Sequence, residues 1–284
     1  MSTAIFFVLV STGTLFAQTK ELIAEGEYEM APGESADAGV LRAVHNAKKS
    51  LIDKTVAYVK GQSKVGRLGL NDEEMRAAVS SIIGVSIVDK KIVKTTGKKG
   101  STSVRVKVKA RITAEKLVSI IERATDKSFV MRYRLVEDAY AVSEAGIAAI
   151  KDAGVPTPSG VGRTASTAEE KSIVTGKLKA NEKLFQAAVF FENGFRHDFA
   201  GKTGPAIEAY TKAIEFNPQF VYAYNNRGLA LSEKGRLEDA IKDFSKAISL
   251  KGDFAFAYNN RGLAYVDTAQ YALAIEDYNK AITL

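Results

Sequence analysis

Residues 221–230 read VYAYNNRGLA, and residues 255–264, which lie 34 positions later, read AFAYNNRGLA. A second motif keeps the same spacing and occurs as AIEAYTKAI at 206–214, AIKDFSKAI at 240–248 and AIEDYNKAI at 274–282. A fixed period of this length is typical of solenoids built from helix pairs. The sequence therefore predicts an all-α repeat array over residues 181–284. The predicted units are 187–220, 221–254 and 255–284.

Two kinds of side chain recur at fixed places within these units. Small residues stand where the two helices of a unit must approach each other, at Gly194, Gly228 and Gly262 and at Ala206, Ala240 and Ala274. Aromatic residues recur at Phe190, Tyr224 and Tyr258 and at Tyr210, Phe244 and Tyr278. This small–large pattern resembles that of the tetratricopeptide repeat (TPR) family. The resemblance implies two helices per unit and a groove, lined by the first helices, that holds peptides or protein segments.

The resemblance also implies which residues line the groove. Carried over by position, they are Phe191, Phe195, Tyr222, Asn225, Asn226, Leu229, Phe256, Asn259, Asn260 and Leu263. Asparagine is a poor helix former, so the paired amides either bind the backbone of a ligand or make local hydrogen bonds kept after a duplication. The variety of this family that clamps a carboxylate uses Lys and Arg in the groove. Phe191, Phe256 and Asn260 stand at those positions here, so a charged chain terminus is not the expected ligand.

The composition favours a binding protein over an enzyme. The 284 residues include no cysteine and two histidines, His45 and His197, which fall in different predicted domains. The absence of cysteine excludes disulfides and thiolate metal sites. The sequence holds no nucleophile motif and no complete phosphate-binding loop. We therefore predict no catalytic residues, no cofactor, no metal site and no nucleic acid partner.

The first residues of the chain form an apolar run. It extends from Ala4 to Phe16 and is interrupted only by Ser, Thr and Gly. The run is short for a bilayer span, and Ala17–Gln18 is a suitable cleavage point. The pattern predicts a signal peptide over residues 1–17, although no Lys or Arg precedes the run; a mis-assigned start or an uncleaved anchor are the alternatives. We expect an exported, periplasmic or envelope-associated protein without a transmembrane segment after removal of the signal.

Residues 19–125 predict a small α+β domain. Period-two alternation and β-branched residues predict strands at 24–30, 85–93 and 104–112. Apolar stripes and capping residues predict helices at 35–60, from Asn71 to Gly84, and after Thr113. A turn at 97–100 joins the last two strands. The order of strand, two helices, hairpin and helix predicts a three-stranded sheet with helices.

The net charge of +7 comes from this domain, because residues 19–125 hold 20 Lys and Arg against 13 Asp and Glu, whereas residues 126–284 hold 20 of each. Four basic residues alternate along the last strand: Arg105, Lys107, Lys109 and Arg111. They form either a site for an anionic polymer or a solvated sheet face. If the first and last strands are neighbours, Glu25, Glu27 and Glu29 lie beside this basic ladder and favour the second interpretation.

Three features of this domain resemble a domain found near the amino terminus of exported bacterial proteins, including the flagellar assembly protein T type. They are the motif AEGEY at 24–28, the alanine-rich helix at 36–58, and the strand at 104–113 with its following helix. The resemblance implies a periplasmic, envelope-associated module and brings no catalytic residues.

A helical spacer is predicted at 126–153 and a flexible linker at 154–180. The spacer carries a heptad-like seam of Phe129, Tyr133, Val136, Tyr140, Ser143, Ile147 and Ile150. The seam serves either self-association or docking onto the preceding domain. The linker prediction rests on the Gly, Pro, Ser and Thr content after residue 153.

These patterns predict an α+β N-terminal domain followed by an all-α helical-repeat solenoid. The predicted function is a non-enzymatic scaffold of the bacterial cell envelope that binds a protein or peptide partner in its groove. The alternative is an anionic-polymer (cell wall or lipopolysaccharide) binding protein that uses the basic ladder. No polar capping helix follows the last repeat. Self-association through the last repeat or the spacer helix is therefore a further expectation.

Overall fold

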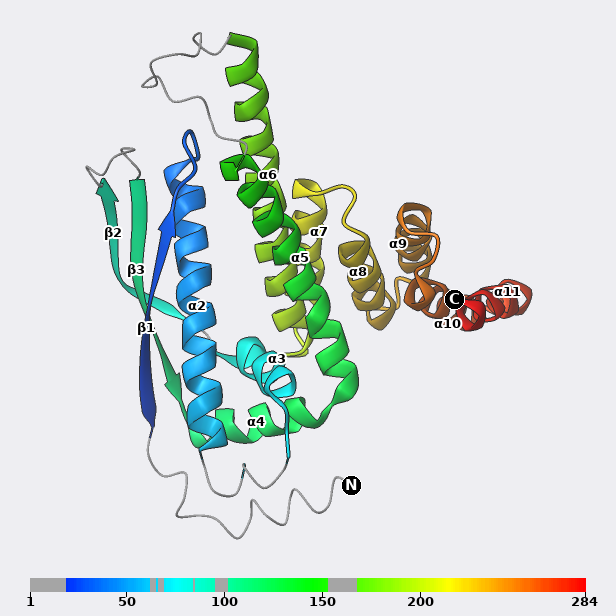
Figure 1. Cartoon of the computed structure of the whole chain (residues 1–284). Helices are drawn as coiled ribbons and strands as arrows, with labels where there is room; N and C mark the ends of the chain where they lie inside the picture. The colour runs from blue at the N-terminus through cyan, green and yellow to red at the C-terminus, as the bar shows by residue number, and fades with distance from the viewer. Residues whose placement is uncertain (1–18, 62–64, 66–68, 84, 95–101, 153–167) are drawn as a thin grey trace. The chain divides into compact units, whose positions relative to one another are not determined.

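A computed structural model describes residues 19–61, 65, 69–83, 85–94, 102–152 and 168–284. The chain divides into two compact units, and Figure 1 labels their helices and strands. The first unit holds the chain up to Arg134 together with residues 149–178, and the second holds Leu135–Ala148 and Lys179–Leu284. The predicted signal peptide at 1–17 and the turn at 97–100 lie outside the described residues.

The first unit contains a three-stranded antiparallel sheet, as predicted. Its strands are β1 (Lys20–Glu29), β2 (Ser86–Lys94) and β3 (Thr102–Ile112), in the order β1-β3-β2. The valines at 104, 106 and 108 are buried, whereas the basic residues between them are exposed or half-buried. This alternation gives the sheet one apolar and one charged face.

Three helices lie wholly within the described part of this unit. They are α2 (Ala36–Lys60), which packs against β1 and β3, and α3 (Asp72–Ile82) and α4 (Ala114–Thr125), which pack against each other. The sequence predicted where they start. The Ser35 side chain accepts from the N–H of Ala38, Asn71 forms a capping box with Glu74, and Thr113 caps α4.

β1 and α2 approach each other closely at Gly26. A Cβ at this position would lie 2.3 Å from the carbonyl oxygen of Ala43 and 2.3 Å from the backbone nitrogen of Ala47. Both alanines are fully buried. The small residues of the alternating strand and of the alanine-rich helix therefore set the distance between sheet and helix, and aliphatic side chains fill the core on either side.

Two long helices, α5 (Lys127–Asp152) and α6 (Ala168–Asp198), each contribute residues to both units. α5 corresponds to the predicted spacer helix. The prediction of a flexible linker over 154–180 is wrong for residues 168–180, which form the first turns of α6. Residues 168–180 are rich in Ala, Glu and Lys, which are good helix formers. The Gly, Pro, Ser and Thr content on which the linker prediction rested belongs mainly to the residues before them. Residues 153–167 lie outside the described part.

The second unit contains the repeats as stacked helix pairs. After α6 come α7 (Thr203–Phe216), α8 (Val221–Glu233), α9 (Leu237–Leu250), α10 (Ala255–Asp267) and α11 (Tyr271–Thr283). In the second repeat a Cβ on Gly228 would lie 2.6 Å from the Phe244 ring, and Gly262 lies similarly close to Tyr278 in the third. The predicted small–large contacts therefore join the two helices of each pair.

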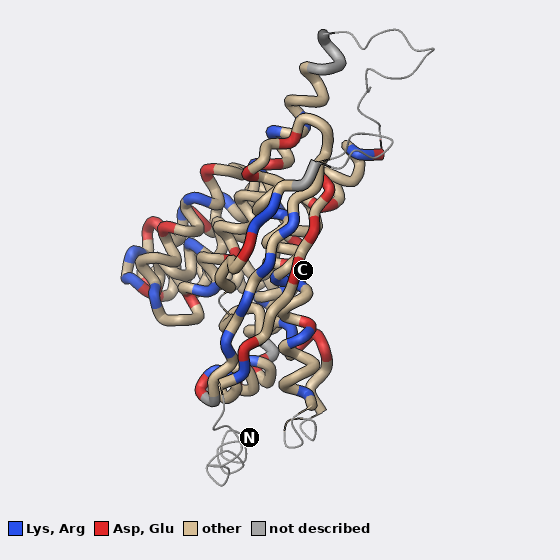
Figure 2. The backbone as a smooth tube through the Cα atoms, turned by 90° about the vertical axis from the view of Figure 1, so that its left-hand side faces the viewer, with Lys and Arg blue, Asp and Glu red and all other residues tan. Residues whose placement is uncertain are grey.

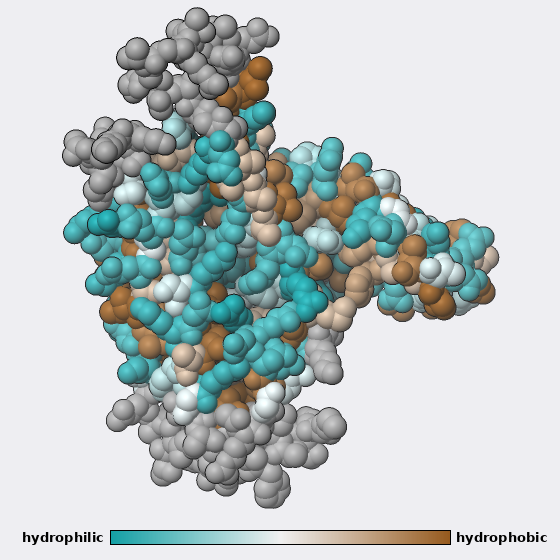
Figure 3. All heavy atoms as spheres, viewed as in Figure 1, coloured by the Kyte–Doolittle hydropathy of each residue, from teal (hydrophilic) through white to brown (hydrophobic). Residues whose placement is uncertain are grey.

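The last helix leaves large apolar side chains exposed. Ile275 is 60% and Ile282 is 82% exposed, whereas Ile241 and Ile248, 34 positions earlier, are partly buried in the repeat core. Figure 3 shows hydrophobic residues scattered among hydrophilic ones on the side in view. Within the described residues, no helix has both the length and the apolarity needed to cross a membrane.

A candidate protein-binding face on the repeats

One side of α8 and α10 carries the same series of side chains. An aromatic residue stands in the first turn, two asparagines follow one turn later, and a leucine follows one further turn along the helix. These eight residues are Tyr222, Asn225, Asn226 and Leu229 in α8 and Phe256, Asn259, Asn260 and Leu263 in α10. Their spacing of three and four places them on one side of each helix. We refer to them as the candidate binding face.

The aromatic residues of this face belong to a continuous row of rings. Ring centroids are 6.4 Å apart between Phe220 and Tyr222, 5.6 Å between Tyr222 and Phe254, and 5.9 Å between Phe254 and Phe256. The ammonium of Lys251 lies 5.7 Å from the Phe254 ring centroid. Phe220 and Phe254 are buried, whereas Phe256 is 55% exposed. The row therefore has a packed base and an exposed end.

The asparagines connect the second repeat to the third. Asn260 Nδ2 donates to Asn225 Oδ1 at 3.0 Å, and Asn225 Nδ2 donates to Asn226 Oδ1 at 3.2 Å. Asn226 is 1% exposed, and its Nδ2 has no hydrogen-bond partner among the described residues. A buried donor without a partner costs on the order of 1–3 kcal/mol. Local hydrogen bonds thus account for Asn225 and Asn260, while Asn226 keeps an unused donor.

The equivalent positions of the first repeat are closed. Phe191 and Phe195 are fully buried, so their side chains do not line an open groove. Phe191 packs against Tyr210 and Phe220, with ring centroids 5.7 and 4.8 Å away. Phe195 packs against Phe199, with ring centroids 4.6 Å apart. Position within the repeat placed these two phenylalanines in the groove, but it does not show that neighbouring rings bury them.

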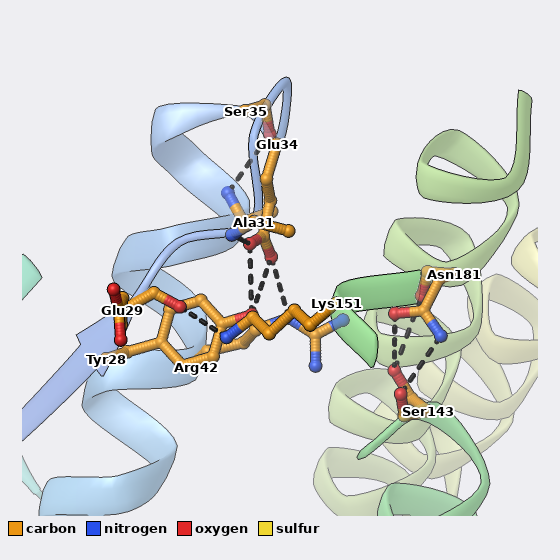
Figure 4. Close-up of polar contacts among 10 residues, drawn as sticks. Tyr28, Glu29, Ala31, Glu34, Ser35, Arg42, Ser143, Lys151 and Asn181 are labelled. Atoms are coloured by element: carbon orange, nitrogen blue, oxygen red, sulfur yellow. Dashed lines mark hydrogen bonds and ion pairs between the residues drawn. The ribbon is translucent and has the colours of Figure 1, made fainter. Parts of the chain in front are cut away.

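That segment of α5 comprises residues 135–148, which belong to the second unit. The Tyr140 hydroxyl donates to Glu192 Oε2 at 2.8 Å, and the Tyr140 ring lies edge-on to Phe185 with centroids 5.4 Å apart. Asn181 Nδ2 donates to the Ser143 carbonyl at 2.9 Å, as Figure 4 shows. The middle of the predicted seam therefore packs against α6. The sequence had suggested self-association or docking onto the preceding domain instead.

A cavity of about 630 Å³ opens beside this segment, within the second unit. Its lining comes from α5, α6, the turn before α8, the start of α8 and the residue that follows α9. The lining residues are Asp138, Ala139, Ala141, Val142, Leu184, Asn217, Gln219, Phe220, Val221, Tyr222 and Lys251. Tyr222 belongs to both the cavity and the candidate binding face. Of the predicted groove residues, Tyr222 alone is part of this lining.

Two arginines clamp the repeats together, and the sequence reasoning missed them. Arg227 binds Asp243 through two hydrogen bonds of 2.7 and 2.8 Å and donates to Thr211 of the preceding repeat. Arg261 binds Asp277 in the same way and donates to Ser245. Hydrogen bonds to the aspartates raise the pKa of both arginines, so the clamps stay charged. The sequence does contain the clue, since an Arg and an Asp 16 residues apart recur after 34.

The basic ladder of β3 lies beside acidic residues of β1. The register pairs Glu25 with Lys107 and Glu27 with Arg105, and basic positions run beside acidic ones along the sheet in Figure 2. The four ion pairs are Arg105–Glu27 at 3.0 Å, Lys107–Glu25 at 3.3 Å, Lys109–Glu21 at 4.0 Å and Arg111–Glu21 at 3.2 Å. This arrangement favours the interpretation of the ladder as a solvated face neutralised within the sheet.

A buried charged cluster ties together β1, α2 and the end of α5 in the first unit (Figure 4). Glu34 accepts from Arg42 Nε at 2.9 Å and from the Tyr28 hydroxyl at 3.0 Å. Lys151 lies 4.3 Å from the Tyr28 ring centroid and donates to the carbonyl of Glu29. Burial, with help from the Glu34 carboxylate, raises the pKa of Tyr28, and burial lowers the pKa of Lys151.

The described residues hold little that suggests reaction chemistry. His45 belongs to the first unit and His197 to the second. In the part of the chain that the structure describes, no group of three or more His, Asp or Glu side chains is placed to hold a metal ion.

Sequence models of the tetratricopeptide repeat match residues 221–254 and 257–284, and a further TPR repeat model matches residues 200–235. Residues 200–284 are tetratricopeptide repeats. The matched segments include both helices that carry the candidate binding face. The resemblance of residues 19–125 to the flagellar assembly protein T type stays a prediction.

Several solved TPR structures are similar to this chain. The second TPR domain of Spaghetti (RPAP3), bound to an HSP90 peptide, is 28% identical, with a TM-score of 0.36; the match covers 37% of this chain and 96% of that chain. The TPR2B domain of yeast Sti1, in complex with pHsp70, is 30% identical, with a TM-score of 0.34 and coverage of 34% and 78%. MamA is 27% identical, with a TM-score of 0.34 and coverage of 40% and 70%. No curated protein matches the chain.

Proposed function

We propose that this chain is a non-enzymatic protein-interaction scaffold, and that its second and third TPR units hold an extended segment of a partner protein. The observation that carries the proposal is the candidate binding face, which α8 and α10 repeat residue for residue in its amides and leucines. Packed helices lie about 8–10 Å apart, a distance that about three residues of extended chain span. Each repeat is therefore expected to contact about three residues of the partner.

The chemistry of the face indicates an internal segment rather than a chain terminus. Exposed Phe256 and Leu263 offer apolar contact area, and the exposed amide of Asn259 can donate to a backbone carbonyl. Phe256 and Asn260 occupy positions where a carboxylate clamp would need Lys or Arg. Aromatic anchors and amides that bind backbone are a combination suited to extended peptides.

Selection from a random linear peptide library against the full chain tests this function. Peptides that bind the candidate binding face lose about tenfold or more in affinity when Phe256→Ala or Asn260→Ala removes a contact. Glu238→Ala, an exposed change on α9 outside the face, is the matched control and leaves binding unchanged. A library that yields no binders, or only binders indifferent to both face variants, would contradict the proposal.

We also propose that the scaffold is exported and acts in the bacterial cell envelope. The support is the apolar run from Ala4 to Phe16, followed by the cleavage point at Ala17–Gln18. When the whole chain is expressed in a bacterium, the periplasmic fraction should contain a protein that begins at Gln18. Recovery of the chain only in the cytoplasm with residues 1–17 attached would overturn this part of the proposal.

A further inference from the structure

We infer that α5, although it lies outside the repeats, forms one wall of the binding site, and that the cavity between α5 and the start of α8 receives one bulky apolar side chain of the bound segment. The inference rests on the function proposed above and makes it specific. In a groove formed by repeats alone, each repeat would offer a bound segment similar contacts. Here α5 lines a pocket beside the second repeat, so this repeat offers a contact that the third does not.

The walls of the cavity have the chemistry of an apolar anchor site. α5 contributes Ala139, Ala141 and Val142, and the opposite side includes Leu184 and the buried ring of Phe220. Its volume of about 630 Å³ falls within the range of small-ligand sites, so one large side chain enters without filling it. Val142 is 60% exposed, so apolar area remains for an occupant to cover.

The polar groups of the lining argue against a charged occupant. Asp138 and Lys251 contribute one negative and one positive charge, and Asn217 and Gln219 are neutral. An acidic or basic side chain would meet one partner and one like charge. An uncharged Leu, Met, Phe or Trp side chain avoids this conflict and gains the apolar contact area.

The cavity adjoins the candidate binding face at Tyr222, which belongs to both. Leu229, a partly exposed residue of the face, lies about two helical turns further along α8. One turn advances about 5.4 Å, so two turns correspond to about three residues of extended chain. A segment that contacts Leu229 therefore places a side chain about three residues away at the cavity.

The wall is held in place before any ligand binds. Tyr140 is fixed to Glu192, and Ser143 is fixed to Asn181 by buried hydrogen bonds. Gly146 allows this closeness, because a Cβ there would lie 2.3 Å from Asn181 Nδ2. A preformed pocket avoids the ordering cost that a mobile wall would add on binding.

The test uses peptides selected from the random library against the full chain. Val142→Trp adds an indole to the α5 wall of the cavity without altering a repeat residue. Ala145→Trp, an exposed position on the same helix that is absent from the lining, is the matched control. We expect the selected peptides to share one bulky apolar residue. Its replacement by Ala weakens binding about tenfold.

A double-mutant cycle completes the experiment. Val142→Trp should weaken the original peptide about tenfold, and in this variant truncation of the apolar anchor should have no further effect. Ala145→Trp should leave both affinities unchanged. Peptides that depend on Phe256 but are indifferent to Val142→Trp would overturn the inference and leave the scaffold function standing. Peptides indifferent to Phe256→Ala as well would overturn both.

Discussion

Gly228 lets the ring of Phe244 approach to within 2.6 Å of the place where a Cβ would stand. Phe244 is fully buried, so its ring has little room to move away. Single contacts of this kind set the spacing of each helix pair, because a repeat array depends on its own pair packing and on its immediate neighbours. The effect of a Gly228 substitution on stability can therefore be predicted from its contact with Phe244.

We expect Gly228→Ala to lower the free energy of unfolding of the second unit by about 1–3 kcal/mol. Overpacking against Phe244 outweighs the better helix propensity of alanine. Gly252→Ala, in the same repeat but with no atom within 4 Å of its Cβ, serves as the control and should be neutral or slightly stabilising. Urea denaturation followed by circular dichroism measures both. Equal stability of the two variants would contradict the packing argument.

Tyr28 links the stability of the first unit to pH. Its pKa in the folded state lies above the unfolded value of about 10, so the folded phenol keeps its proton longer. The stability that this provides is fully present below about pH 10 and is lost as the pH rises through the folded pKa. The charged groups facing it are Glu34, Arg42 and Lys151. Lys151 has a lowered pKa and acts with the opposite sign.

Above about pH 10, the free energy of unfolding should therefore fall more steeply in the wild type than in Tyr28→Phe. Lys151 is present in both proteins, so the comparison isolates the phenol. Urea denaturation at a series of pH values from about 8 to 11 measures the two slopes. Parallel slopes would show that burial and the Glu34 carboxylate do not raise the pKa of Tyr28 in the folded protein.

The 34-residue repeat made the packing roles of some residues predictable but did not reveal the ion pairs and hydrogen bonds of others. Gly228 and Phe244 were recognised because the same residue types return every 34 positions. Arg227 and Asp243 repeat equally well, but charged residues on helices are usually solvated, so their half-buried pairing was not expected. Asn226 Nδ2 lacks a partner because the neighbouring amides of Asn225 and Asn260 hydrogen-bond in one particular pattern. Sequence spacing does not predict which amide pairs with which.

At the scale of elements, local patterns predicted what each segment forms. Alternation predicted the three strands. The sequence left open whether the first and last strands are neighbours, and the register shows that β1 pairs with β3. Capping residues predicted the starts of α3 and α4, and an apolar stripe predicted α2. The pairing of α5 with α6 was missed, because a heptad-like seam shows that a helix has a partner and does not say which one.

Gly146→Ala tests the pairing of α5 with α6. The added Cβ would meet Asn181 Nδ2 and disturb buried hydrogen bonds to Ser143, so we expect the second unit to lose about 1–3 kcal/mol. Gly204→Ala, in α7 with open space around its Cβ, should cost nothing. Thermal or urea unfolding of the two variants measures the difference in their free energies of unfolding. A neutral Gly146→Ala would mean that α5 is not held against α6 as described.

At the scale of the whole molecule, the sequence predicted an α+β part before a helical-repeat part, and the structure confirms this fold class. The boundary is less simple than expected, because α5 and α6 each divide between the two units. Residues 135–148 belong with the repeats although they precede residues 149–178 of the first unit. Contacts over such sequence distances come from tertiary packing, which local patterns do not encode.

The central proposal is that the candidate binding face of the repeats binds a partner segment. Amide hydrogen exchange of the full chain, with and without a library-selected peptide, tests this most directly. We predict slower exchange in α8 and α10 and in residues 138–142 of α5, with α9, α11 and β3 unchanged. Protection confined to α9 and α11, or to the basic strand β3, would contradict the claim.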